Sequence, residues 1–241
     1  MTDTPTYIGT AGWSMPSRYA ERFPAEGSHL ERYARRLNAA EINTSFYRPH
    51  RRATYEHWAA SVPADFRFAV KLPRTMTHEQ RLKDCGDLLD RFIGEATGLG
   101  PQLGVLLVQL PPSLPFEAEA VEGFFAELRR RIDAPAACEP RHASWFGPEA
   151  EELLAALQIA RVAADPARAT GAGAPGGWGG LVYYRLHGSP KIYYSDYDEA
   201  VLAGMRRRLQ KHRAAGVPAW CIFDNTAAFA ALGNALAVTG L

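Results

Sequence analysis

Short apolar runs alternate along the chain with stretches of helical periodicity, and nearly every apolar run ends in a polar or ionisable residue. The runs predict eight strands, over Thr6–Thr10, Ala40–Asn43, Phe66–Lys71, Gly104–Gln109, Ala136–Glu139, Ala160–Asp165, Leu181–His187 and Ala219–Asp224. Most of the intervening stretches carry apolar residues three and four positions apart, as one face of a helix does. This alternation is typical of parallel βαβ units.

The number of strands favours an α/β fold, a (β/α)8 TIM barrel that residues 1–241 form as a single domain. The length of 241 residues matches the usual size of such a barrel. Between the sixth and seventh strands, residues Gly171–Gly180 are too rich in glycine for a regular helix, and we expect an irregular loop there. An open, doubly wound sheet is the alternative, but the even spacing and short connections favour closure.

Several of the helical stretches begin with residues that favour a helix start. The predicted starts are Ser28 as an N-cap, the pairs Thr77–Gln80 and Asp196–Glu199 as capping boxes, Pro148 in a first turn, and Asn225 as the last N-cap.

Composition and charge indicate an ordinary globular protein. The chain is 47% hydrophobic and 22% charged, and its formal net charge of +1 gives no overall attraction to nucleic acid or to a membrane. We find no secretory signal pattern and no apolar stretch of the roughly 20 residues that a bilayer span needs, so we expect a cytoplasmic protein that is not inserted in a membrane. The widely spaced Cys85, Cys138 and Cys221 suggest buried free thiols.

In a closed barrel the carboxyl ends of all strands open onto one face, where active sites are built. The polar residues at and just after the strand ends are therefore the candidate site. The candidate catalytic residues are Glu139, His187, Asp224 and Asp165. The candidate ligand-binding residues are Trp13, Asn43, Tyr47, Lys71, Gln109, Arg141, His142, Trp145, Arg185 and Asn225.

The chemistry of these residue types leaves several roles open. A strand-terminal Glu139 can act as general acid or base, and a nearby Arg141 can hold an oxyanion. Alternation places Arg185 and His187 on the same side of one strand. An inward Arg185 needs carboxylate partners, so a structural ion network and a catalytic site are equally consistent with it. Lys71 can be an anion anchor, a Schiff-base nucleophile or a salt-bridge partner.

Other classes of site have weaker support. The sequence has no GxSxG, Walker A or GxGxxG motif after the first strand, which argues against serine hydrolases, P-loop NTPases and Rossmann dehydrogenases. Oxygen and nitrogen ligands for a divalent metal occur on neighbouring strands, at Glu139, His142, Asp165, His187 and Asp224. No local ligand spacing such as HExxH supports them, so the cofactor remains unassigned.

A set of motifs spread over the whole chain resembles those of the YecE-like family, also called domain of unknown function 72. The motifs are Ile8–Ser14, Glu41–Asn43, Ser45–Pro49, Phe68–Lys71, Thr77–His78, Leu106–Pro112, Arg141–His142, Ser144–Trp145, Tyr184–Gly188, Phe223–Asn225 and Asn234–Ala235. The resemblance implies a (β/α)8 barrel. It adds little on function, because the family's reaction is not established and fold alone does not carry an activity.

We therefore predict an enzyme that acts on a small anionic ligand, phosphorylated or carboxylated, at the carboxyl-terminal face of the barrel. Lys71, Arg141 and Arg185 would hold the anion. Glu139 and His187 would transfer protons, and Asp165 or Asp224 would orient the base. The sequence leaves the substrate, the reaction and the oligomeric state open.

The sequence also leaves two alternatives open. One is a nucleic-acid-binding or metal-dependent nuclease-like protein, with nucleic acid as its partner. Its track would consist of arginines beside aromatic residues, namely Arg48, Arg51, Arg52 and Arg74 with Trp13, Phe46 and Tyr47. The other is a non-catalytic binding scaffold, which predicts that all ionisable groups of the mouth are paired with each other.

Overall fold

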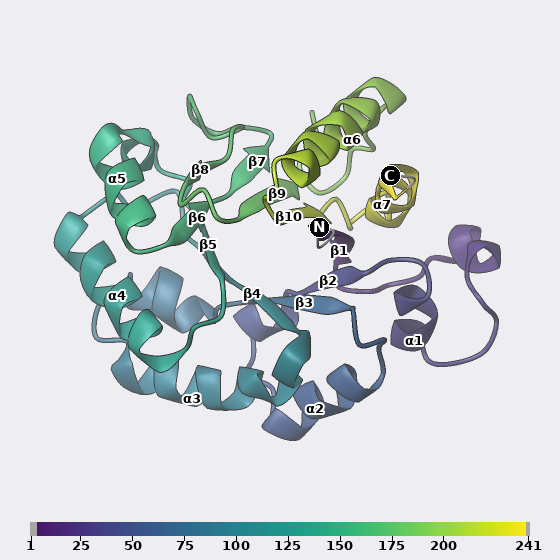
Figure 1. The fold of residues 1–241 in the computed structure, drawn as a ribbon, viewed down its shortest axis with the longest axis horizontal. Helices are drawn as coiled ribbons and strands as arrows, with labels where there is room; N and C mark the ends of the chain where they lie inside the picture. The colour runs from purple at the N-terminus through teal and green to yellow at the C-terminus, as the bar shows by residue number, and fades with distance from the viewer. Residues whose placement is uncertain (1–3, 240–241) are drawn as a thin grey trace.

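Parallel strands form a nearly closed, barrel-like sheet in the computed structural model, which describes residues 4–239 (Figure 1). The ten strands are β1 (Thr6–Ala11), β2 (Ala39–Ile42), β3 (Arg67–Lys71), β4 (Leu103–Gln109), β5 (Ala136–Glu139), β6 (Ile159–Arg161), β7 (Ala163–Asp165), β8 (Gly176–Gly177), β9 (Val182–Leu186) and β10 (Ala219–Phe223). Their order in the sheet is β7-β9-β10-β1-β2-β3-β4-β5-β6-β8. Every pairing in this described sheet is parallel except β6 with β8.

The predicted sixth strand is divided into two, and this division sits where the sheet nearly closes. β6 pairs with β5, whereas β7 pairs with β9. Val162 separates β6 from β7, and its backbone N–H donates to the Cys138 carbonyl at 2.8 Å. One continuous segment therefore bonds to β5 at its beginning and to β9 at its end.

The glycine-rich segment contains no helix, as expected, but it is not wholly irregular. Gly176 and Gly177 form β8, which runs antiparallel to β6. The carboxylate of Glu151 accepts a hydrogen bond from the Gly177 N–H at 2.6 Å and also pairs with Arg161. These contacts fix the segment against the sheet.

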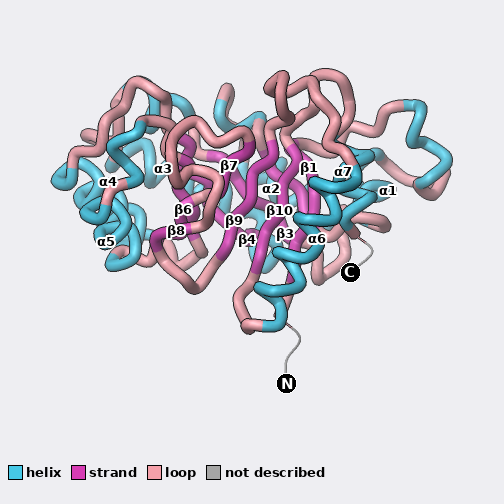
Figure 2. The backbone as a smooth tube through the Cα atoms, turned by 90° about the horizontal axis from the view of Figure 1, so that it is seen from above, coloured by secondary structure: helices cyan, strands magenta, loops and turns pink. Residues whose placement is uncertain are grey.

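Helices lie around the sheet (Figure 2). Their apolar side chains pack into the same buried core as the strands. The α-helices are α1 (His29–Ala34), α2 (Arg52–Ala60), α3 (Gly86–Ala96), α4 (Ala118–Arg131), α5 (Pro148–Ala156), α6 (Glu199–Ala214) and α7 (Ala231–Val238). Short 3-10 helices cover Ser17–Arg22, Thr44–Phe46, Thr97–Gln102 and Ala143–Phe146, and Thr75–Glu79 is a π-helix. The helices bury side chains such as Leu89, Phe125 and Leu209 against the outer face of the strands.

Two of the predicted helix starts are confirmed and one is wrong. Ser28 forms a reciprocal capping box with Glu31, and Pro148 occupies the first turn of α5. The predicted capping box of Thr77 and Gln80 does not form, because α3 begins only at Gly86. Thr77 lies inside the π-helix, where its hydroxyl is 2.9 Å from Nδ1 of His78.

The other two predicted starts are also wrong, since their side chains tie loops together instead. Asp198, not Asp196, caps α6 by accepting from the Val201 N–H at 2.9 Å. The last helix, α7, begins at Ala231. The Asn225 amide donates to the Ser195 carbonyl and to the side chain of Asn234, at 2.9 and 2.8 Å.

The interior of the sheet is apolar toward the amino ends of its strands and charged toward their carboxyl ends. The apolar part is a buried cluster that includes Leu107, Tyr183 and Trp220. A Cβ atom on Gly104 would lie 2.5 Å from the Trp220 ring, so glycine makes room for that ring. Because side chains alternate along a strand, the same strands carry polar groups one step further toward their carboxyl ends.

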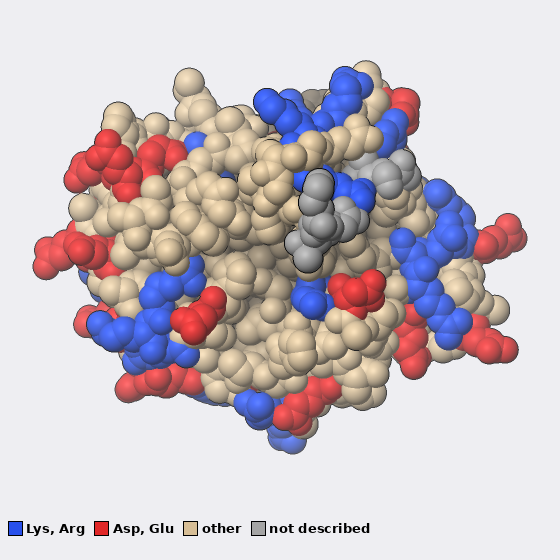
Figure 3. Space-filling view, in the orientation of Figure 1, with Lys and Arg blue, Asp and Glu red and all other residues tan. Residues whose placement is uncertain are grey.

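The face drawn in Figure 3 shows no single dominant charge, because basic and acidic side chains are interspersed around its outline. No helix within residues 4–239 is long and apolar enough to cross a membrane.

Candidate functional site

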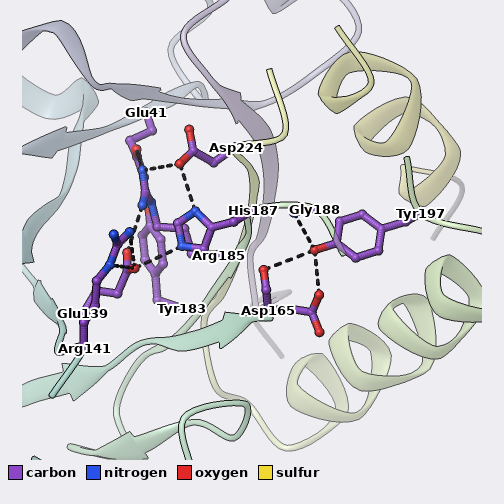
Figure 4. Close-up of polar contacts among 10 residues, drawn as sticks. All are labelled: Glu41, Glu139, Arg141, Asp165, Tyr183, Arg185, His187, Gly188, Tyr197 and Asp224. Carbon is purple, nitrogen blue, oxygen red and sulfur yellow. Dashed lines mark hydrogen bonds and ion pairs between the residues drawn. The ribbon is translucent and has the colours of Figure 1, made fainter. Parts of the chain in front are cut away.

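The guanidinium of Arg185 on β9 lies at the centre of a buried cluster of three carboxylates (Figure 4). It donates to Glu41 on β2 through Nε and Nη2, at 2.9 and 2.7 Å, and to Glu139 on β5 through Nη1 at 2.9 Å. Asp224, just after β10, lies 3.1 Å from Nη2. Burial opposes the positive charge, but these carboxylates together raise the pKa of Arg185 well above its ordinary value.

His187 is held between two carboxylates. Its Nδ1 lies 3.0 Å from Asp224 Oδ2, and its Nε2 lies 3.0 Å from Glu139 Oε1. Both partners are acceptors when ionised, so both ring nitrogens act as donors and the ring is an imidazolium. Burial lowers the pKa of His187, yet the negative charge of Glu139 and the hydrogen bonds to the two carboxylates outweigh it and raise the pKa.

Glu139 is engaged on both of its oxygens. Oε2 accepts from Arg185, while Oε1 accepts from His187 and from Nε and Nη2 of Arg141, at 3.1 and 3.0 Å. Burial alone would raise the pKa of Glu139, but Arg185, His187 and Arg141 hold it well below its ordinary value. Glu139 is therefore an ionised anchor that joins the three cations.

Lys71, at the end of β3, differs from the other cations of this layer. Its side chain is 5% exposed, and no hydrogen bond or ion pair joins its amine to another residue in the described range. The amine lies 4.0 Å from the centre of the Phe46 ring, a cation–π contact. Burial, and then the positive charge of Arg185, lower the pKa of Lys71 to about 8.

His78, carried by the π-helix after β3, extends this cationic side of the site. Its ring packs edge-on against Phe46 at 4.9 Å. Burial, followed by the positive charges of Lys71, Arg74 and Arg141, lowers its pKa to about 4. The ring is therefore neutral near pH 7, and the positive field that acts on it comes from all three cations.

A small cavity opens next to the cluster. It has a volume of about 10 Å³, room for about one water molecule, and Glu139, Arg141 and His187 are among its lining residues. Tyr193 packs edge-on against the His187 ring at 5.9 Å, and its backbone N–H donates to the His187 carbonyl at 2.5 Å. Tyr193 has φ of 70°, an unusual value for a bulky side chain that often occurs at functional sites.

Of the predicted residues, the structure brings five into direct contact in this cluster: Glu139, Arg141, Arg185, His187 and Asp224. Lys71 belongs to the same layer through its electrostatic coupling to Arg185. Three more predicted residues lie at strand ends: Asn43 directly after β2, Gln109 as the last residue of β4, and Asn225 shortly after β10. The Oδ1 atoms of Asn43 and Asn225 are buried without a hydrogen-bond partner in the described chain.

The carboxylate of Asp165 bonds to Tyr197, whereas the His187 ring bonds to Asp224 and Glu139. The Asp165 carboxylate accepts a hydrogen bond from the Tyr197 hydroxyl at 2.7 Å, and the Asp165 carbonyl accepts from the His187 backbone N–H at 2.7 Å (Figure 4). Tyr197 in turn accepts from the Gly188 N–H at 2.9 Å. Gly188 has φ of 93°, and a Cβ there would lie 2.9 Å from the Ser195 carbonyl oxygen, so this turn requires glycine.

The remaining predicted residues support loops. Trp145 is buried, and its indole donates to the Leu114 carbonyl at 3.0 Å. His142 lies 2.8 Å from the Ser144 hydroxyl. Trp13 packs against Trp58 at 5.2 Å, and Tyr47 is 73% exposed on the rim.

Sequence reasoning did not include Glu41, Tyr183, His78 or Tyr193 among the site residues. Glu41 is fully buried and accepts from the Tyr183 hydroxyl at 3.0 Å as well as from Arg185. The available signal was a charged residue within the apolar run Ala39–Ile42, on the same side of the strand as Asn43.

Within residues 4–239, no group of three His, Cys, Asp or Glu side chains is arranged to hold a metal ion. Glu139 and Asp224 direct their oxygens toward Arg185 and His187.

A nearly closed α/β barrel with a charged layer at the carboxyl ends of its strands defines the class of this protein. The family model "Protein of unknown function DUF72" matches residues 7–241, and the chain belongs to this family. UPF0759 protein YecE of Escherichia coli strain K12 is 32% identical over 147 residues, 61% of this chain and 52% of that protein. The match thus spans about half the length of this relative.

Solved structures share the fold. A DUF72 family protein from Enterococcus faecalis V583 superposes with a TM-score of 0.78 at 20% identity, covering 97% of this chain and 94% of that one. A DUF72 family protein from Thermotoga maritima MSB8 gives a TM-score of 0.76 at 24% identity, with 96% of each chain covered.

Proposed function

We propose that this protein is an enzyme that binds a small anionic ligand, carboxylated or phosphorylated, at the carboxyl ends of its barrel strands. The observation that carries the proposal is the unpaired amine of Lys71 in a layer whose carboxylates are already engaged by other cations. Arg141 adds a second cation at the cavity. A bound anion would supply the negative charge that this side of the site lacks.

The proposed roles follow from the contacts of each residue. Lys71 and Arg141 bind the anion, whereas Arg185 holds the three carboxylates of the cluster in place. His187 is the proton donor, because its Nε2–H points to Glu139 at the cavity. A ligand oxygen that displaces Glu139 from Nε2 would receive this proton, and Asp224 would keep the ring oriented through Nδ1.

Access to this site requires movement of the rim, because the cavity of about 10 Å³ is too small for a sugar phosphate or an oxo acid. The side chain of Tyr193 is 39% exposed and covers His187. We propose that the ligand enters by displacing this side chain.

The proposal is tested by thermal shift with inorganic phosphate, a phosphorylated sugar and pyruvate, each at several concentrations. We expect at least one of these anions to raise the melting temperature of the wild type in a saturable way. Lys71→Met and Arg141→Met should lose that response. The exposed controls Lys83→Met and Arg91→Met, which pair with Glu117 and Glu95, should keep it. Equal responses in all four variants would contradict the site.

The two alternatives lack comparable support. The scaffold interpretation requires a fully paired mouth, which the amine of Lys71 does not fit. The nucleic-acid interpretation relies on four arginines, Arg48, Arg51, Arg52 and Arg74. Two of them, Arg52 and Arg74, pair with Glu56 and Glu79, at 2.9 and 3.1 Å.

The proposal also covers the finer description of the fold and the location of the protein in the cell. We interpret β6 and β7 as one barrel strand broken at Val162, which makes the sheet a single-domain (β/α)8 barrel. We also propose a cytoplasmic location, supported by three buried cysteines that are all unpaired. Cell fractionation tests the location.

A further inference from the structure

The sequence contains four lysines, and Lys71 is the buried one. Lys83, Lys191 and Lys211 are exposed. Lys83 pairs with Glu117 at 2.8 Å, and Lys191 lies over the Tyr194 ring at 4.2 Å. The chain therefore contains its own reference amines for any reaction at Lys71.

Burial lowers the pKa of Lys71 to about 8, so a larger share of its amine is neutral near pH 7 than for an exposed lysine. The nearby carboxylates are engaged elsewhere: Glu41 by Arg185 and Tyr183, Glu139 by Arg185, Arg141 and His187, and Asp224 by Arg185 and His187. The positive charge of Arg185 further disfavours protonation. A desolvated lysine beside another cation is the arrangement that makes an amine nucleophilic near neutral pH.

The position of the amine is also restricted. The backbone carbonyl of Lys71 accepts from the buried Ser45 hydroxyl at 2.6 Å, which links the end of β3 to the segment after β2. Phe46, in the same segment, places its ring under the amine. The lysine therefore leaves the strand in a defined direction, toward the cationic side of the site.

The anion and the amine lie in one neighbourhood. The positive charges of both Lys71 and Arg141 act on His78, so both cations lie near that ring. A ligand that binds Arg141 through an anionic group can bring an adjacent carbonyl carbon to the amine of Lys71.

We propose that Lys71 forms an imine with a small carbonyl compound that carries a carboxylate or phosphate group. This inference rests on the proposed anion site and names the class of its substrate. The Nζ lone pair attacks the carbonyl carbon, and the carbonyl oxygen takes up a proton to give a carbinolamine. The nitrogen then expels this hydroxyl, which leaves as water with one further proton, and the amine loses one of its own. The balance is one amine, one carbonyl and one proton giving one iminium ion and one water.

The experiment is reductive trapping on the full chain. The protein is incubated with sodium cyanoborohydride and either pyruvate or glyceraldehyde 3-phosphate, and acetone serves as the carbonyl without an anionic group. Intact mass and peptide mapping then locate the reduced adduct. Pyruvate and glyceraldehyde 3-phosphate distinguish a carboxylate from a phosphate substrate.

We expect one adduct for each chain, at Lys71, formed at least about tenfold faster than at any exposed lysine, because the lowered pKa of Lys71 increases its neutral fraction. Acetone should react more slowly at Lys71. Lys71→Arg keeps the charge but has no free amine, so it should bind the anion in a thermal-shift assay without forming the adduct; Lys71→Met should do neither.

The outcomes separate this inference from the proposed function. Anion binding with no adduct at Lys71, or with equal labelling of Lys83, Lys191 and Lys211, overturns the imine and leaves the anion site standing. An adduct at Lys71 that forms equally fast with acetone supports the reactive amine but contradicts the anion site.

Discussion

The two sides of the charged layer contain similar residues but differ in whether their cations are paired with carboxylates. On one side, Arg185 and His187 are surrounded by carboxylates, and each of these two cations lies at hydrogen-bond distance from its carboxylate partners. On the other side, burial lowers the pKa values of Lys71 and His78, and the positive charges of neighbouring cations lower them further.

This difference separates structure from function. A paired, buried ion cluster is costly to break, because removing one partner leaves uncompensated charge in the interior. An unpaired cation contributes little to stability and remains able to bind a ligand. We therefore expect mutations on the Arg185 side to unfold the protein and mutations on the Lys71 side to affect ligand binding.

The largest effect is expected from Arg185→Met. This change leaves Glu41, Glu139 and Asp224 without their common partner, so the free energy of unfolding should fall by about 3–5 kcal/mol in urea titrations. Arg91→Met, an exposed residue of a surface pair, should change it by less than about 1 kcal/mol. A similar small loss in both variants would contradict the structural role of the cluster.

The next largest effect concerns His187 and depends on pH. Because the folded-state pKa of His187 is raised above its ordinary value of 6.5, its stabilisation is fully present below pH 6.5 and is lost as the pH rises through the raised pKa. His187→Gln should cost about 1.5–3 kcal/mol of unfolding free energy at pH 6 and less at pH 10. Urea titrations at both pH values measure this, and a cost that is independent of pH would show that the ring is neutral in the folded protein.

A smaller change in stability is expected for Lys71→Met. The variant loses a cation–π contact but also an unpaired buried amine, so its unfolding free energy should stay within about 1 kcal/mol of the wild type. Its thermal response to anions should nevertheless be absent. A loss as large as that of Arg185→Met would place Lys71 in the structural half of the layer.

The smallest effect is expected for Tyr47→Ala on the rim. Tyr47 is 73% exposed and contacts the Phe46 ring at 4.9 Å, so urea titration should give a change within about 0.5 kcal/mol. The thermal response to anions should also be unchanged. Its loss would extend the binding site from the charged layer to the rim aromatics.

The sequence pattern predicted the strands closely because burial on both faces leaves a clear apolar run at each of them. The strand Ala136–Glu139 was predicted with its observed bounds, and most others within one or two residues. The residues at strand ends were therefore placed correctly on one side of the sheet. The division of the predicted strand Ala160–Asp165 at Val162 depends on pairing with two different neighbours, which no local pattern encodes.

The missed features depend on tertiary contacts. Asn225 and Asp196 are good helix caps in isolation, but here their side chains bond to Asn234 and hold loops together. Glu41 becomes central only because the sheet closes and brings β2 opposite β9. The sequence left the role of Lys71 open for the same reason, since its unpaired state depends on which partners the three carboxylates take.

The most direct test of the unpaired Lys71 is its own titration. With four lysines in the chain, the Cε resonances can be followed by NMR from pH 6 to 11 and assigned with Lys71→Met. We predict a pKa of about 8 for Lys71, which rises when a saturating anion without a carbonyl group, such as inorganic phosphate, occupies the site. A pKa near the ordinary value of 10.5, unchanged by every anion tested, would contradict the account.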